Sequence, residues 1–171
     1  LCDGAALEAL KLISKWLKVA FDQPENINAR GGMLIGSCLA GVAFTKGLGL
    51  VHSISHMIGA EYNTQHGLTN AIILPAVMKF NLPYVGEKVG SICHAMDLKD
   101  ASSDLITEEI EKILNYVDIP RSLSEIGIPL ECKKRIAKKA MLDSATGTNP
   151  RVAQIEDIEE LTEISILSAR K

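Results

Sequence analysis

Apolar residues recur along this chain every three or four positions, which is the period of an amphipathic helix, and no segment alternates as a strand does. The first helix is predicted to begin with Asp3 as its N-cap residue. Prolines and a Gly-Thr-Asn-Pro turn fall where helices are expected to stop. Further helices are predicted over 28–45, 50–58, 66–81 with a kink at Pro75, 85–96, 106–117, 130–143 and 155–167. The fold class is therefore all-α, with seven or eight helices.

The charged residues are distributed unevenly. Between Arg30 and Lys79, 48 residues carry only two charges, on Lys46 and Glu61. A membrane span is one interpretation of such a segment, but glycines, three histidines and a polar run at 63–65 interrupt it, and no apolar block of spanning length is left. We expect a buried central layer of helices, covered by the amphipathic helices on either side.

Composition limits the classes of function. The chain has 171 residues, a net charge of −3, 47% hydrophobic and 23% charged residues, so it can bury a core as one domain. The mild acidity argues against a nucleic-acid partner or an anionic membrane. Four cysteines without a Cys-x-x-Cys pair indicate reduced thiols, with Cys38 and Cys93 expected in the core. Because the chain opens with Leu1 rather than an initiator methionine, and its first residues already lead into a helix, we expect it to be part of a longer protein.

Three of the four histidines lie in the charge-poor segment. His52 and His56 are four positions apart, so a helix presents both from one face, and His66 stands at the start of the next helix. Imidazole is a common ligand of iron and zinc. The alternative is that the histidines are hydrogen-bonded core residues. The segment has no His-Glu-x-x-His motif, and Glu61 is its only acid, so the ligand set of a catalytic metal is incomplete here.

One run of residues resembles a known family. The segment 47–56 (GLGLVHSISH), followed by Gly59, then Gln65-His66-Gly67 and 70–75 (NAIILP), is similar to the signature of the iron-containing (group III) alcohol dehydrogenases. Within that family the chain looks most like the lactaldehyde reductase and butanol dehydrogenase types. There are two departures: Gln65 stands where the family has proline, and 74–77 (LPAV) lacks the histidine of many members.

The resemblance implies a dehydroquinate-synthase-like fold, in which an N-terminal α/β domain binds the nicotinamide cofactor and a C-terminal helical domain carries the metal. Residues 1–171 match most of the helical domain only. On this resemblance, His52 and His66 are two of four metal ligands, and His56 lies near the nicotinamide as a catalytic residue. The other two ligands, an Asp and a His on one helix, would lie upstream of Leu1.

The function implied is that of a metal-dependent, NAD(P)-linked alcohol dehydrogenase or aldehyde reductase. Its cofactors would be Fe²⁺ or Zn²⁺ and NAD or NADP, the nucleotide bound mainly by the N-terminal domain. The expected protein is a cytoplasmic homo-oligomer, such as a dimer, that acts on a small alcohol or aldehyde, and the present chain would be inactive alone. Two alternatives are a zinc glycerol dehydrogenase-like polyol oxidoreductase and a non-catalytic helical binding module that keeps the histidines in its core.

Overall fold

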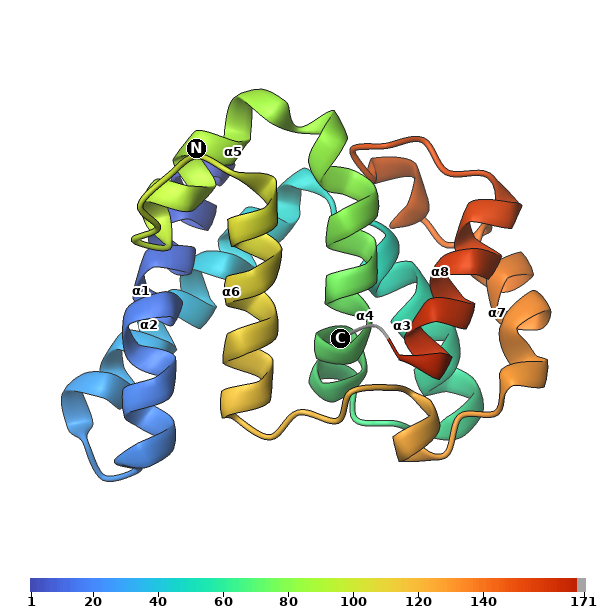
Figure 1. Ribbon diagram of the computed structural model, residues 1–171, viewed down its shortest axis with the longest axis horizontal. Helices are drawn as coiled ribbons and strands as arrows, with labels where there is room; N and C mark the ends of the chain where they lie inside the picture. Colours follow the sequence, from blue (N-terminus) through green and yellow to red (C-terminus); the bar gives the residue numbers. More distant parts are fainter. Residues whose placement is uncertain (169–171) are drawn as a thin grey trace. The chain divides into compact units, whose positions relative to one another are not determined.

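The computed structural model describes residues 1–168 and consists of helices joined by turns (Figure 1). No strand occurs in this part of the chain, which confirms the all-α class. The chain forms two compact units. The first unit comprises Leu1–Gly47 and Val85–Val117, and the second comprises Leu48–Tyr84 and the chain from Asp118 onward.

In the first unit, α1 (Cys2–Asp22) packs along α2 (Ile27–Ala43). Glycines allow the close approach: a Cβ atom added to Gly32 would lie only 2.1 Å from Cδ1 of Trp16. The indole ring thus rests on the α2 backbone, where a larger residue would collide. Two further helices, α5 (Gly86–Ala95) and α6 (Ser103–Tyr116), complete the unit.

The expectation of a buried central layer is wrong for α2. Gly32 and Gly36 face α1, whereas Leu34 is 73% and Ile35 58% exposed. Cys38, expected in the core, is exposed as well, whereas Cys93 is buried; all four thiols are free. Among residues 1–168, one segment, Ile27–Lys46, is long and apolar enough by length and composition to cross a membrane, a criterion that core helices of soluble proteins also meet.

Several predicted helix boundaries also differ; the helix predicted over 50–58, for example, continues to Tyr62. The first helix begins at Cys2 with Leu1 as its N-cap residue, so Asp3 lies in the first turn, where its carboxylate pairs with the ammonium of Lys88 at 3.1 Å. The helix predicted over 130–143 is divided into a 3-10 turn at Leu130–Cys132 and α7 (Lys133–Ala140). A local turn ends α7 because the Thr146 hydroxyl donates to the Ala140 carbonyl at 2.7 Å.

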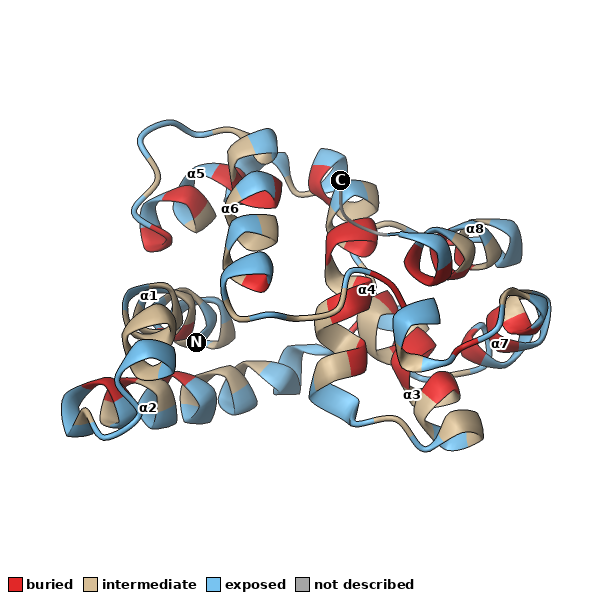
Figure 2. Ribbon diagram, turned by 60° about the horizontal axis from the view of Figure 1, so that its bottom comes forward, coloured by how far each residue is buried: buried red, intermediate tan, exposed pale blue. Residues whose placement is uncertain are grey.

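The second unit is organised around α3 (Leu50–Tyr62) and α4 (His66–Asn81), which pack against each other and are covered by α7 and α8 (Ile155–Leu167). α4 continues through Pro75. Figure 2 shows buried residues, in red, on α4, α7 and α8. The largest fully buried side chains of this unit are Leu50, Ile54, Ile58, Ile72, Ile73, Val77, Leu123, Ile128, Ile136, Ile158 and Ile166.

An asparagine fixes the start of α3. The Asn149 Oδ1 atom accepts hydrogen bonds from the Leu50 N–H at 3.2 Å and from Asn81 Nδ2 at 2.9 Å. Its Nδ2 atom donates back to Asn81 Oδ1 at 2.7 Å. Gly49 has a φ of +97°, a conformation that favours glycine, and a Cβ there would lie only 3.0 Å from Asn149 Oδ1, a tight contact. The first turn of α3, which carries His52, is therefore held in place.

Core packing yields the first prediction. Ile54→Ala removes a fully buried side chain between the helices of the second unit, so the free energy of unfolding is expected to fall by about 2–5 kcal/mol. Leu142→Ala, at a residue of the same unit that is 84% exposed, is the control and is expected to change it by less than about 0.5 kcal/mol. Urea denaturation followed by circular dichroism measures both, and equal effects would contradict this packing.

A polar contact between α3 and α7 yields the second prediction. Glu61 accepts from Arg135 Nε at 2.9 Å and from Lys139 Nζ at 2.7 Å, and these two hydrogen bonds hold the pKa of Glu61 below its usual value. A carboxylate with a depressed pKa stabilises the fold above its unfolded-state pKa, and that stabilisation is lost as the pH falls through the folded-state pKa.

Glu61→Gln is therefore expected to destabilise the chain at neutral pH by less than about 1 kcal/mol, because the pair is partly solvated. The difference in free energy of unfolding between Glu61→Gln and the parent sequence should disappear in strong acid. Denaturation midpoints measured from neutral to acidic pH test this, with Glu160→Gln, at an exposed position in the middle of α8, as the control. A Glu61→Gln effect of the same size at every pH would count against the ion pairs.

Candidate metal centre

Three histidine side chains lie close together in the second unit, two on α3 and one at the start of α4. The ring centroids of His52 and His66 are 5.3 Å apart, those of His56 and His66 5.5 Å, and those of His52 and His56 5.8 Å. His52 and His56 come from α3, and His66 is the first residue of α4. The structure thus brings together all three candidate site residues.

Two of the three imidazoles face a common point. The side-chain nitrogen of Asn70, one turn along α4 from His66, lies 3.0 Å from His66 Nε2 and 3.4 Å from His52 Nε2. The Asn70 Oδ1 atom is buried and has no hydrogen-bond partner among residues 1–168. The two imidazoles that face the same point are therefore those of His52 and His66, from two helices. The i, i+4 pair on α3, His52 and His56, does not do so.

His56 faces a different partner. Its Nδ1 atom lies 3.0 Å from Oδ2 of Asp143, a residue of the turn that follows α7. The other carboxylate oxygen, Oδ1, accepts the Ala145 N–H at 2.8 Å. His56 is therefore tied to a carboxylate, and its side chain is 36% exposed.

The electrostatics favour a neutral imidazole at His52. Burial lowers the pKa of His52, and the positive charges that His66 and His56 can carry lower it further. A neutral imidazole is the form that binds a metal ion. Burial by itself would raise the pKa of Asp143, but the hydrogen bonds from Ala145 and His56 outweigh it and hold that pKa below its usual value.

This donor set fits part of a metal site. Two imidazole nitrogens aimed at one point are the ligand type that Fe²⁺ and Zn²⁺ accept. Within residues 1–168, no group of three or more His, Cys, Asp or Glu side chains is placed to hold an ion. The described residues thus bring two imidazole nitrogens to one point, fewer than the three protein ligands that a catalytic metal needs.

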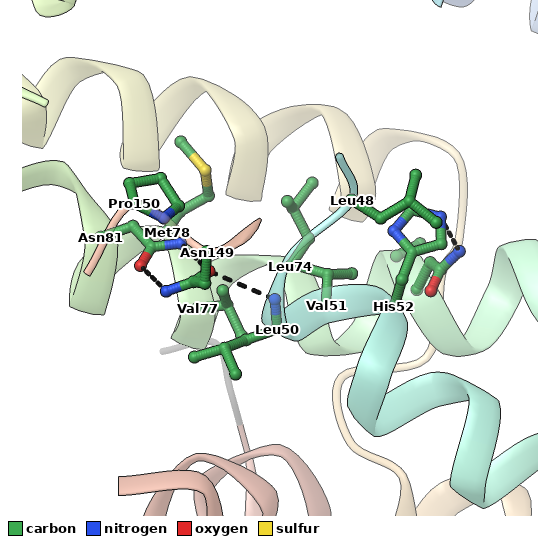
Figure 3. A pocket seen from close by; sticks show the side chains of 12 residues that line it. Leu48, Leu50, Val51, His52, Leu74, Val77, Met78, Asn81, Asn149 and Pro150 are labelled. Carbon is green, nitrogen blue, oxygen red and sulfur yellow. Dashed lines mark hydrogen bonds between the residues drawn. The ribbon is translucent and has the colours of Figure 1, made fainter. Parts of the chain in front are cut away.

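An apolar cleft of about 400 Å³ lies beside His52. Figure 3 shows Leu48 and His52 at one end of it and Asn149 and Pro150 at the other. It has room for the carbon skeleton of a small molecule next to the imidazole pair. Its other lining residues are Leu50, Val51, Asn70, Ala71, Leu74, Val77, Met78 and Asn81.

Sequence reasoning missed two residues of this centre. Asn70 had a local signal, since it stands four positions after His66 on the same predicted helix. Asp143 had none, because it is 87 positions from His56 in the chain and only the tertiary fold joins them.

Comparison with known proteins places the chain in a family. Residues 1–166 match the model of the Fe-containing alcohol dehydrogenase family, C-terminal domain. The chain belongs to this family. It is 36% identical over 167 residues to the NAD-dependent methanol dehydrogenase of Bacillus methanolicus, covering 93% of this chain and 44% of that protein. It is 37% identical over 170 residues to the lactaldehyde reductase of Escherichia coli K12, covering 94% of this chain and 44% of that protein.

Solved structures agree with the fold. A 1,3-propanediol oxidoreductase superposes with a TM-score of 0.91 at 31% identity, over 96% of this chain and 45% of that one. The alcohol dehydrogenase from Oenococcus oeni gives a TM-score of 0.90 at 30% identity, over 95% of this chain and 44% of that one. The family and the helical domain expected from the sequence motifs are thus confirmed. The chain spans less than half the length of the relatives it matches.

Proposed function

We propose that this chain is the metal-carrying helical part of a metal-dependent, NAD(P)-linked alcohol dehydrogenase or aldehyde reductase. The observation that carries the proposal is the convergence of His52 Nε2 and His66 Nε2 on one atom of Asn70. In a chain of the Fe-containing alcohol dehydrogenase family, two imidazole nitrogens that face one point are suited to bind a divalent metal ion.

His52 and His66 would hold Fe²⁺ or Zn²⁺, together with ligands from an upstream part of the longer protein. When bound, the divalent cation supplies Lewis-acid polarisation of the substrate oxygen, and the nicotinamide supplies the hydride chemistry. Asn70 would turn its amide away from the two nitrogens to admit the ion. Because this chain offers only two ligands, it would not turn over substrate alone.

The remaining residues would act on the substrate itself. His56, on the next turn of α3 after His52, would take the alcohol proton and pass it toward solvent, to which its ring is open. The apolar cleft beside His52 would bind the carbon skeleton, with Leu48 and Leu74 excluding water from it.

The partners follow from the family. NAD or NADP would be bound mainly by an N-terminal α/β domain, and the substrate would be a small alcohol or aldehyde. The relatives carry the names of different substrates, among them methanol, lactaldehyde and 1,3-propanediol, so they do not single out one alcohol. The full protein would be a cytoplasmic homo-oligomer with neither a membrane nor a nucleic acid as partner.

Metal content tests the proposal. The chain should be prepared as it stands and in a form extended upstream to the length of its relatives, and its metal measured by mass spectrometry. We expect the extended protein to hold about one Fe or Zn per chain, and His52→Ala to lose it. His94→Ala, at an exposed position in the first unit, is the control and should keep the metal.

An extended protein without metal, or metal retained by His52→Ala, would contradict the proposal. If the extended protein folds without binding an ion, and His52→Ala and His66→Ala alter only its stability, the histidines belong to a non-catalytic binding module. If the bound metal is zinc, and the extended protein turns over polyols but not monohydric alcohols, the glycerol dehydrogenase-like alternative is favoured.

A further inference from the structure

The carboxylate of Asp143 is placed to decide which nitrogen of His56 carries the proton. We propose that Asp143 is a positioning residue: it accepts the Nδ1–H of His56 and thereby leaves Nε2 of that ring unprotonated and oriented. The inference deepens the role proposed above for His56 and rests on it for its functional meaning. Both residues of the contact, with 3.0 Å between Nδ1 and Oδ2, lie within this chain.

Asp143 is largely buried and held by two hydrogen bonds. Its side chain is 14% exposed, and its two oxygens have separate partners, the Ala145 N–H at Oδ1 and the imidazole at Oδ2. The turn around it is closed by the Thr146 hydroxyl, which donates to the carbonyl of Ala140. A rotation of the carboxylate would therefore break one of its two hydrogen bonds.

An ionised carboxylate can only accept hydrogen bonds, so the facing nitrogen has to be the donor. In a neutral imidazole the other nitrogen then keeps its lone pair. Nε2 lies on the edge of the ring away from Asp143. The ring itself stacks on His66, with centroids 5.5 Å apart and planes within 15°. The Asp143 carboxylate and the His66 ring together fix the orientation of the His56 ring. In that orientation Nε2 is the nitrogen that can accept a hydrogen bond.

The hydrogen bond to Ala145 makes the pairing testable by an isosteric change. In Asp143→Asn the amide oxygen is the only group that can accept the Ala145 N–H, so it takes the Oδ1 position. The amide NH₂ then stands where Oδ2 was and donates to His56 Nδ1. A ring whose Nδ1 accepts must carry its proton on Nε2, so the variant keeps the shape of the site and reverses the tautomer.

Long-range ¹H–¹⁵N correlation spectra of this chain, recorded at alkaline pH without metal, report the tautomer of His56. We expect the Nδ1–H form in the parent sequence and the Nε2–H form in Asp143→Asn. Ser144→Ala, at the exposed neighbouring position, is the control and should leave the Nδ1–H form in place. Circular dichroism establishes that each variant is folded.

The Nε2–H form in the parent sequence would overturn the inference, and so would an unchanged tautomer in Asp143→Asn. The parent spectrum decides the matter even if the variant does not fold. In the extended enzyme, Asp143→Asn should lower kcat by about 10²-fold or more while KM and the metal content stay close to those of the parent. Loss of metal together with kcat would overturn the positioning role, because the residue would then act on the metal ligands.

The two proposals fail separately. If the spectra show the Nδ1–H form but the extended protein binds no metal, the proposed function is wrong, whereas the control of the His56 tautomer by Asp143 stands. If the metal binds and the tautomer is the opposite one, the metal site stands and the positioning role of Asp143 does not.

Discussion

The packing of α3 against α4 is the constraint on which the rest of the site depends. The two nitrogens proposed to bind the metal belong to His52 in the first turn of α3 and His66 at the start of α4, so neither helix can present the pair alone. Fully buried isoleucines such as Ile54 and Ile72 set the distance and rotation of the two helices. A close-packed core transmits small shifts, so a change in this packing would move the nitrogens apart.

Polar contacts fix the ends of α3 within this apolar packing. Asn149 fixes where α3 begins, just before His52, and Glu61 ties the other end of α3 to α7. The turn after α7 then presents Asp143 to His56. Each contact joins segments that are far apart in the sequence, which is why the site depends on the whole second unit. The apolar cleft beside His52 is a product of the same arrangement.

Much of this was predictable from the sequence, for identifiable reasons. Helical periodicity and the proline and glycine stops predicted most helices, and the motif around His52, His56 and His66 was enough by itself to indicate the family. Periodicity does not tell which apolar face is buried. In α2 the glycine face packs against α1 and leaves Leu34 exposed, opposite to the expectation. Asp143 could not be predicted as a site residue, because only the tertiary fold brings it to His56.

The central claim is that His52 and His66 bind one metal ion between their Nε2 atoms. The most direct measurement is an anomalous-difference map from crystals of the extended enzyme grown with Zn²⁺. The result in agreement is a single peak within about 2.0–2.1 Å of both nitrogens, with the Asn70 amide displaced from between them. A map with no peak there, or a peak bonded to His56 and Asp143 instead, would contradict the claim.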